Sequence, residues 1–482
     1  MSKRILQLRL LALAFTAVSS ISLLSSCMVG PEYRRPLAPE ASNFRETLPE
    51  GWATAEPNDG VLRSAWWEVY NDPQLNRLEE QIAINNQNVI AAEARFSEAK
   101  AAVRGARSSE LPAVTAFPAA TVSGTNATPD VQHRSFNIPI DAVWQADVWG
   151  SIRHTVAANA AVAQASAAEL EDARLLYQSE LAVDYFQIEG VDAEQQLLDA
   201  AVKSYEQYVQ LTKDRFEGGV ASMDDVALAQ TQLETARVQL TDLQIQRAEL
   251  EHAMAVLVGR PPSDLSIPAM SAQSPPPYTL TGVPSALLER RPDVASAERQ
   301  VAAANEQIGV AKAALFPSLT LSASGGSQTT AFDDLLSWPT RFWSVGPQVA
   351  QTLFDAGKRK AQVAGAEAAY DATAANYRQT VLMAFQQVED SLAQLRVLAE
   401  ETDVANRAVA AAKQTLELST IQYRGGLTNY LQVIIAQTSA LQTQRSAVQI
   451  LTRRNVASVL LIEALGGGWD ASQLPSVKEV RR

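Results

Sequence analysis

Two copies of one pattern decide the fold: RFEGGVASMDDVALAQTQL at residues 215–233 and QYRGGLTNYLQVIIAQTSA at residues 422–440. A shift of 207 residues aligns the glycine pairs, Gly218-Gly219 with Gly425-Gly426. A second pair of stretches, NNQNVIAAEARFSEAKAAV at 85–103 and RRPDVASAERQVAAANEQI at 290–308, aligns at a shift of 205. The chain therefore carries an internal duplication, and each copy is one structural unit of about 200 residues.

Each copy predicts very long helices. Residues 140–260 and 348–474 contain no proline and are rich in Ala, Leu, Gln and Glu, which favour helix. The first long helix is expected from about Ser151 to Phe216, a length of about 100 Å at 1.5 Å per residue. The paired glycines then supply the left-handed residues that end a helix and reverse the chain.

The returning helices carry apolar residues at spacings of three and four, the pattern of a coiled-coil seam. The seam residues are Val226, Ala229, Leu233, Ala236, Leu240, Leu243, Leu250, Met254 and Leu257 in the first copy, and Val433, Ala436, Ala440, Ala447, Ile450, Ala457, Leu461 and Ala464 in the second. Arg247 and Arg454 interrupt the seams at equivalent positions, which suggests a lumen, a charge pair or a register device. Because an isolated hairpin about 100 Å long has no core, the pattern predicts a ring or sheath of helices.

Alternating residues predict strands between the helices. Residues 135–148, SFNIPIDAVWQADV, alternate over a length greater than the usual 5–6 residues and fit the ~9–11 that cross a bilayer at a tilt. A weaker strand is predicted at 114–124, and two more between about 318 and 354. Residues suited to interfacial aromatic girdles are Trp144, Trp149, Trp338 and Trp343. A soluble two-sided sheet has the same periodicity and stays open as an alternative.

The number of strands favours an oligomer. Four strands in one chain cannot close a barrel, since transmembrane barrels begin at about eight strands and open edges are not tolerated in lipid. Two chains would supply eight strands, which side chains fill, whereas three would supply twelve, which leave a pore. The strands therefore predict a homotrimer.

The first 26 residues predict an export signal, with a basic start followed by an apolar run. Leu24-Ser25-Ser26-Cys27 is similar to a bacterial lipobox, so we expect Cys27, the only cysteine, to carry the anchoring lipid. Met28 at the next position, in place of Asp, implies the outer membrane. The formal charge of the chain is -13, and it becomes -16 when the signal's three basic residues leave. This balance disfavours nucleic acid and anionic lipid surfaces as partners.

No residues predict catalysis. His133, His154 and His252 lie in unrelated elements, lack metal-ligand spacing and are expected on solvated surfaces. The carboxylates are interpreted as solvated helix faces. We therefore expect no enzyme activity, no metal and no cofactor, apart from the diacylglycerol and N-acyl lipid on Cys27.

Five motifs resemble the outer membrane factor family of TolC-like channel proteins, in the lipidated efflux type similar to OprM and NodT. They are CMVGPEYRRP (27–36), WWEVYNDPQLNRL (66–78), LLERRPDVASAERQVAAANEQIGVAKAALFPSLTLSASGG (287–326), LFDAGKRKA (353–361) and EALGGGW (463–469). The resemblance implies a trimeric twelve-stranded transmembrane β-barrel with four strands per chain. It also implies a long periplasmic α-helical barrel continuous with those strands, and a small equatorial domain.

This resemblance also implies a function: an outer-membrane exit duct of a tripartite efflux system that exports drugs or other small molecules. The implied partners are a periplasmic adaptor, an inner-membrane RND-type pump and outer-membrane lipid. Two alternatives stay open, the duct of a type I protein secretion system and a lipid-tethered periplasmic coiled-coil scaffold.

In this family the hairpin tips close the periplasmic end and dock the adaptor. The matching residues are Arg215, Phe216, Gly218, Gly219, Val220, Tyr423, Arg424, Gly425, Gly426 and Leu427. In the family, acidic rings and polar ties beyond the turns serve as the gate, and the candidates here are Asp224, Asp225 and Gln432. Asp224 and Asp225 equally suit the first turn of a helix, where the helix dipole favours acids, so this alternative stays open. The second copy departs from the family pattern, because residues 430–435 contain no acid.

The expected organisation has six parts: a signal peptide (1–26), a lipidated segment contributing to the equatorial domain (27–73), a first repeat (74–266) with strands at about 113–148 and its turn at 218–219, a proline-rich linker (267–284), a second repeat (285–469) with its turn at 425–426, and a C-terminal tail (470–482).

Overall fold

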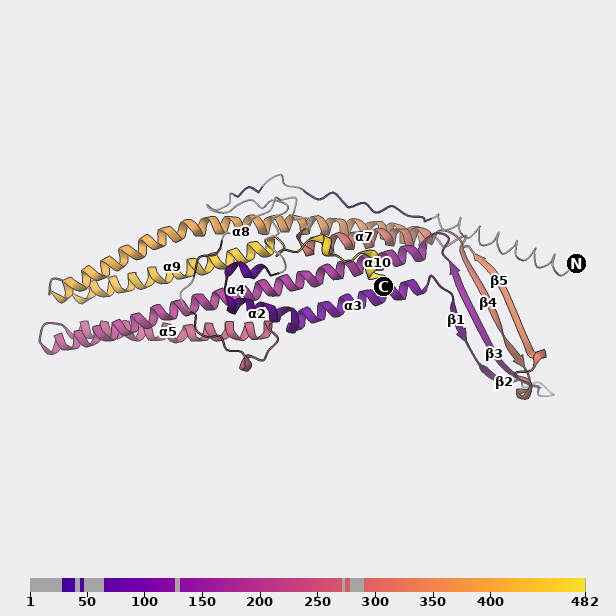
Figure 1. Ribbon diagram of the computed structural model, residues 1–482, viewed down its shortest axis with the longest axis horizontal. Coiled ribbons are helices and arrows are strands. Elements are labelled where there is room, and N and C mark those ends of the chain that lie inside the picture. The colour runs from indigo at the N-terminus through magenta and orange to yellow at the C-terminus, as the bar shows by residue number, and fades with distance from the viewer. Residues whose placement is uncertain are drawn as a thin grey trace.

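The computed structural model describes residues 28–39, 44–46, 65–125, 131–270, 274–277 and 290–481. Long helices run along most of its length, and a narrow sheet extends from one end (Figure 1). The predicted signal peptide and Cys27 lie outside the described residues. In the part of the chain that is described, no helix combines the length and the apolar character needed to cross a membrane.

The elements in chain order are η1 (Trp66–Tyr70), α2 (Pro73–Asn85), α3 (Gln87–Ser108), β1 (Ala113–Ala116), β2 (Ala119–Thr125), β3 (Val131–Ala146), α4 (Ser151–Glu217), α5 (Met223–Leu257), η2 (Pro262–Asp264), α7 (Pro292–Ala313), β4 (Ser318–Thr329), η4 (Phe332–Asp334), η5 (Trp338–Thr340), β5 (Arg341–Ala350), α8 (Lys358–Arg424), α9 (Tyr430–Ala464), η6 (Ala471–Gln473) and α10 (Val477–Val480).

The two longest helices, α4 and α8, each contain 67 residues. The helix predicted from about Ser151 to Phe216 is thus confirmed. Both helices start at a glycine in the left-handed region, Gly150 with φ 84° and Gly357 with φ 88°. Glycine adopts this conformation without steric penalty, so each marks the place where a strand passes into a long helix.

Five antiparallel strands form one sheet in the order β1-β3-β4-β5, with β2 also paired to β3. The single strand predicted at 114–124 is wrong, because the chain divides there into β1 and β2 at Phe117-Pro118. Pro118 has no backbone N–H to donate to the neighbouring strand, which explains the break. Both segments pair with β3, so β1 and β2 together occupy one edge of the sheet and β5 the other.

The strands differ from their predicted bounds at two further places. β3 spans Val131–Ala146, which starts before the predicted Ser135 and ends before Val148. β5 ends at Ala350, and the alternation predicted to continue to Leu353 is wrong. Leu353 is 93% exposed in the segment that turns toward α8, where Asp355 accepts hydrogen bonds from the N–H groups of Gly357 and Arg359.

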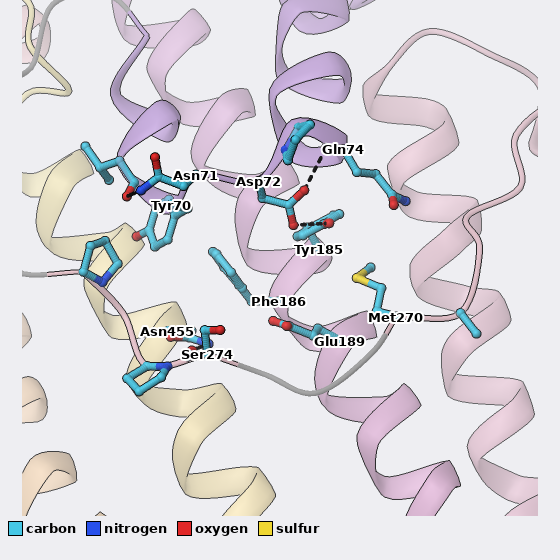
Figure 2. Close-up of a pocket in the computed structure, with 15 residues that line it drawn as sticks. Tyr70, Asn71, Asp72, Gln74, Tyr185, Phe186, Glu189, Met270, Ser274 and Asn455 are labelled. Atoms are coloured by element: carbon cyan, nitrogen blue, oxygen red, sulfur yellow. Dashed lines mark hydrogen bonds between the residues drawn. The ribbon is translucent and has the colours of Figure 1, made fainter.

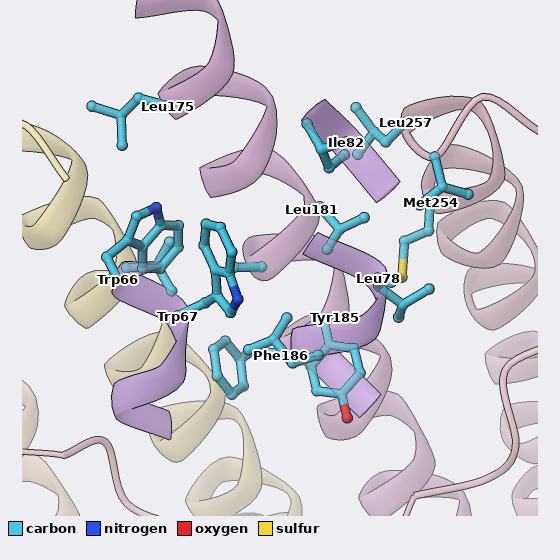
Figure 3. Close-up of a cluster of buried hydrophobic side chains, with 14 of the residues drawn as sticks. Trp66, Trp67, Leu78, Ile82, Leu175, Leu181, Tyr185, Phe186, Met254 and Leu257 are labelled. Atoms are coloured by element: carbon cyan, nitrogen blue, oxygen red, sulfur yellow. The ribbon is translucent and has the colours of Figure 1, made fainter. Parts of the chain in front are cut away.

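A large hydrophobic cluster joins η1 and α2 to the middle of α4 and to the C-terminal ends of α5 and α9, and Figure 3 shows part of it. Trp66 and Trp67 of η1 pack edge to face at 5.9 Å, beside residues of α2, α4 and α5. Ile82 and Leu181 are fully buried there. Burial of each such side chain contributes about 1.5–3 kcal/mol, so this cluster fixes the N-terminal elements against the long helices.

Two interpretations of polar residues are wrong. His154 is not on a solvated surface: it is 3% exposed, because α4 starts against α7 and the ring lies over Gly309. Its Nδ1 lies 2.6 Å from Glu306 Oε2, and its Nε2 lies 3.1 Å from the carbonyl of Val29. His133 and His252 are exposed, as expected.

The carboxylates are not all solvated either. Glu79 is fully buried in the cluster around α2, and neither carboxyl oxygen has a hydrogen-bond partner within the described residues. Burial raises its pKa well above the usual value, because the charged carboxylate is poorly solvated there. Asp192 is 2% exposed and lies 2.6 Å from Arg247 Nε, which makes Arg247 a charge-pair residue. For Arg454 no ion pair occurs among the described residues.

Candidate functional site: the tips of the two helical hairpins

The two hairpin turns have the same backbone design and lie at the same end of the molecule (Figure 1). In the first, Gly219 N–H donates to the Phe216 carbonyl and Val220 N–H to that of Arg215, both at 2.9 Å. This pair of bonds is a Schellman motif, which ends a helix with a left-handed residue. Gly219 supplies that residue, with φ 72°.

The second turn repeats the motif one for one. Gly426 N–H donates to Tyr423 O at 3.0 Å, and Leu427 N–H donates to Gln422 O at 2.9 Å. Gly426 has φ 73°. A Cβ added at Gly219 or Gly426 would meet no atom within 4 Å, so these turns need glycine for its backbone conformation and not for space.

The helices that leave the turns are capped differently. At α5, Ser222 Oγ accepts from the Asp225 N–H at 3.2 Å, and Asp225 Oδ2 accepts from the Ser222 N–H at 3.1 Å. This is a complete capping box. At α9, Asn429 Oδ1 accepts only from the Gln432 N–H, at 3.4 Å. The N-terminus of α5 is therefore held by more capping hydrogen bonds than the N-terminus of α9.

This geometry separates the three gate candidates. The Asp225 carboxylate is engaged by the capping box, whereas Asp224 is exposed beside it. Gln432 aligns with Asp225 at the shift of 207 residues and is exposed in the second hairpin. Asp225 thus has a structural role in the first copy, and Asp224 is the carboxylate left for other contacts.

Arg215 ties the first hairpin to the second. Its Nη1 donates to the Tyr423 carbonyl at 3.0 Å, and its guanidinium carbon lies 4.6 Å from the centre of the Tyr423 ring. Cation–π contacts of this kind contribute about 0.5–2 kcal/mol, more when they are shielded from water. Tyr423 is 3% exposed, so the contact is largely shielded.

A cluster of tyrosines lies behind this tie. Tyr430 contacts both Tyr423 and Tyr208, with ring centres 5.4 and 6.1 Å apart. Tyr208 Oη lies 2.8 Å from Thr420 Oγ1 and forms a second link between the hairpins. Burial raises the pKa values of Tyr430 and Tyr423, so both remain neutral phenols. The two tips are therefore joined within one chain by aromatic and polar contacts.

The outermost tip residues are exposed, and several are apolar. Val220 is 69% exposed and Leu427 is 82% exposed, with Phe216 partly exposed beside the first turn. Met223, the first residue of α5, is 60% exposed and was missed by the sequence analysis. Met223 directly follows the N-cap Ser222, and this position next to the turn could have identified it as a tip residue.

Comparison with solved structures defines the class of protein. The chain is similar to the outer-membrane channel OprN, with a TM-score of 0.82 and 28% identity, over 92% of this chain and 100% of that one. The long hairpins and the attached sheet are therefore the architecture of an outer-membrane channel.

Sequence comparison defines the family. The model of the outer membrane efflux protein family matches residues 78–260 and 283–467, and the chain belongs to this family. One relative is the probable efflux pump outer membrane protein TtgC of Pseudomonas putida, 29% identical over 95% of this chain and 96% of that protein. Another is the probable outer membrane lipoprotein SilC of Salmonella typhimurium, 26% identical over 95% and 99%.

These findings confirm the predicted family, the outer-membrane location and the predicted function, an exit duct of an efflux system. The family is one of channel proteins, in agreement with the absence of catalytic motifs in the sequence.

Proposed function

We propose that three copies of this chain form a single tube that spans the outer membrane and the periplasm. The observation that carries this proposal is the sheet with two open edges, β1/β2 on one side and β5 on the other. Unpaired edges are costly in lipid, and the β5 edge of one chain can pair with the β1/β2 edge of the next. With the interrupted β1/β2 edge counted as one strand, each chain supplies four strands, and three chains would give a twelve-stranded barrel, continuous with a barrel of long helices.

Exposed apolar surface on α8 supports the same assembly. Leu382, Met383, Val404, Leu418 and Ile421 are each between 48 and 59% exposed. These residues recur along α8 between positions 382 and 421, and in the proposed tube a neighbouring chain would cover them. We also propose a small equatorial domain, which would lie around Trp66 and the chain ends. The six-part organisation of the chain given in the sequence analysis is part of the same proposal.

We assign the hairpin tips two roles in this tube. The apolar tip residues Phe216, Val220 and Leu427 would dock a periplasmic adaptor that leads to an inner-membrane RND-type pump. The polar tie from Arg215 to Tyr423 would hold the two hairpins of a chain together while the tips close the tube. Gly218, Gly219, Arg424, Gly425 and Gly426 would shape the docking surface, and Asp224, Asp225 and Gln432 would line its rim.

Lipid on Cys27 would anchor the mature chain to the outer membrane. Contacts of the following segment support this placement. The Val29 N–H donates to the Trp149 carbonyl at 3.1 Å, close to the end of β3. Val29, two residues after Cys27 in the sequence, thus lies at the junction between sheet and helices. The cargo is proposed to be drugs or other small molecules.

The test combines assembly with conduction. Purified full-length protein should migrate as a heat-sensitive trimer and conduct ions in planar bilayers. Deleting the gene should increase susceptibility to a panel of drugs when the partner pump is expressed. A monomer without conductance would contradict the tube, and unchanged susceptibility with an altered set of secreted proteins would favour protein secretion.

A further inference from the structure

Residues 28–39 form a strap that has no helix or strand of its own. Side chains of α7 and α8 hold this strap by donating hydrogen bonds to the carbonyls of Pro31 and Leu37. At the start of the strap, the Val29 carbonyl faces a ring nitrogen of His154 on α4. This first contact differs from the others, because histidine is the side chain that ordinarily changes charge near neutral pH.

Both ring nitrogens of His154 face oxygen atoms. Nδ1 lies 2.6 Å from Glu306 Oε2, and Nε2 lies 3.1 Å from the Val29 carbonyl oxygen. Because a carbonyl can only accept, the contact with Val29 requires a hydrogen on Nε2. The contact with Glu306 then requires a second hydrogen, either on Nδ1 or on the carboxyl group. The pair therefore holds one proton more than a neutral imidazole beside an ionised carboxylate.

Removing that proton leaves one hydrogen for two contacts. If the hydrogen stays on Nε2, the lone pair of Nδ1 faces the Glu306 carboxylate. If the hydrogen lies on Nδ1, the lone pair of Nε2 faces the Val29 carbonyl oxygen. A hydrogen bond to a charged acceptor is about twice as strong as one between neutral groups, so the hydrogen favours Nδ1. The contact with Val29 is then the one that breaks.

Close packing keeps the ring of His154 in this position. The side chain is 3% exposed. A Cβ added at Gly309 of α7 would lie 2.4 Å from the ring, and one added at Gly30 would lie 2.9 Å from the Gly309 Cα. The strap, the ring and α7 are therefore in direct contact, and the ring cannot turn toward solvent while the strap stays in place.

The elements around the ring contribute few other charges. On α4, the neighbouring Arg153 pairs with Asp147 at 3.1 Å. On the strap, the first ionisable side chain is that of Glu32, which is exposed. On α7, the charged group that contacts the ring is Glu306. Within the described residues, the protonation of this contact is therefore a matter between His154 and Glu306.

We propose that His154 and Glu306 form a proton-dependent latch for the strap. With the shared proton present, the ring joins α7 to the Val29 carbonyl and holds the start of the strap. When the proton leaves, the bond to Val29 breaks, and the start of the strap separates from the junction between sheet and helices. The latch acts next to Cys27, the expected lipid site. Its contacts lie within one chain, so the inference does not depend on the proposed trimer or adaptor.

The test follows the strap with a nitroxide label at Glu32→Cys, an exposed position. Lipid would occupy the thiol of Cys27, the only native cysteine, so the chain without the substitution should take no label. Electron paramagnetic resonance is recorded on the full chain in detergent at pH 5.5, 7 and 8.5, which brackets the range in which histidine ordinarily changes charge. The rotational correlation time of the label should shorten reversibly by about threefold from pH 5.5 to pH 8.5.

A second label tests where the release occurs. At Leu37→Cys, later in the strap, the backbone carbonyl accepts from Arg378 Nε at 3.1 Å. Arginine stays charged throughout this pH range, so the label there should change little. Equal release at both labels would show that pH acts on the whole strap and would contradict a latch at Val29.

Glu306→Gln separates a latch from a structural contact. The new amide can donate to Nδ1 of a neutral ring, whose Nε2 hydrogen then reaches Val29 at every pH. The label at position 32 should therefore stay immobilised from pH 5.5 to pH 8.5. The matched control is Glu367→Gln, which changes an exposed carboxylate of α8 that pairs with Lys312 of α7 and should keep the full pH response. Circular dichroism confirms that both variants are folded.

Three further results would overturn the proposal. The first is an unchanged label at position 32 between pH 5.5 and pH 8.5 in the chain with native His154 and Glu306. The second is a pH response that survives in Glu306→Gln. The third is a label that is mobile at every pH in Glu306→Gln, because the pair would then be a structural contact only.

Discussion

The helices α4 and α8 have the same length and equivalent places in the two repeats, but very different surroundings. Of their 67 residues each, 27 are buried in α4 and 11 in α8. α4 packs against α2, α3, α5, α7, α9 and α10, whereas α8 packs mainly against α7 and α9. One copy of the duplicated unit thus forms the centre of the chain, and the other forms its margin.

This difference shows how a duplicated sequence serves two purposes. Elements of both repeats surround α4 with partners from the same chain, and α8 keeps a largely exposed face. In the proposed trimer, that face meets the next subunit. The comparison therefore predicts that substitutions at buried positions of α4 act on the fold, whereas substitutions at exposed apolar positions of α8 act on the assembly.

Substitutions of apolar side chains are expected to give the largest difference between α4 and α8. Leu181 on α4 is fully buried, so Leu181→Ala should destabilise the chain by about 3 kcal/mol through lost burial and a residual cavity. Leu382 on α8 is 48% exposed, and Leu382→Glu should leave the chain folded but weaken the trimer. Thermal unfolding by circular dichroism and unboiled gel electrophoresis separate the two effects. If both variants lost fold and assembly to a similar extent, the proposed division of roles between α4 and α8 would be wrong.

A partly buried carboxyl on α4, that of Asp172, should give a smaller effect on stability that depends on pH. Burial and the nearby Asp293 raise the pKa of Asp172 to about 7, against the opposing effect of Arg291. The folded chain then holds a proton that the unfolded chain releases above about pH 4, so stability falls as pH rises from 4 to 7.

Asp172→Asn should remove that slope and stabilise the protein at pH 8 by about 2 kcal/mol, allowing for partial exposure. The matched control is Asp371→Asn, at an exposed position of α8. The measurement is the midpoint of thermal unfolding between pH 4 and 8. A slope that survives in Asp172→Asn would show that other groups cause it.

Substitutions of the N-cap residues of α5 and α9 are expected to give the smallest difference between the two repeats. Ser222→Ala breaks the capping box of α5 and should cost about 1 kcal/mol. Asn429→Ala removes a single long bond at α9 and should cost about 0.5 kcal/mol. Hydrogen exchange of the first-turn amides reports each loss locally. A larger loss of stability in Asn429→Ala than in Ser222→Ala would contradict the conclusion that α5 has the stronger cap.

The sequence predicted the long helices and the paired turns because their signals are local. Proline-free stretches and glycine pairs act within a few residues, so the ends of α4 and the turn at Gly218-Gly219 could be placed closely. The Pro118 break was also visible in the sequence, but the alternation around it concealed the interruption. Local rules thus described the helices better than the strands.

The misjudged polar residues depend on distant contacts. Burial of His154 needs Glu306 and Val29, and burial of Glu79 needs the cluster around Trp66. Figure 2 shows a pocket lined by residues as far apart in the sequence as Asp72 and Asn455. No spacing in the sequence brings such residues together, because only the packing of α2, α4 and α9 does so. The tie from Arg215 to Tyr423 was hidden for the same reason.

The open edges of the sheet have a genetic consequence. If every seam of the barrel joins β5 of one subunit to β1/β2 of the next, a subunit with a damaged edge also disables its two normal neighbours. When mutant and normal chains are made in equal amounts and mix freely, only about one trimer in eight contains normal chains alone. Lesions at β5 should therefore behave as dominant in a merodiploid strain, whereas lesions that unfold the chain before assembly should be recessive.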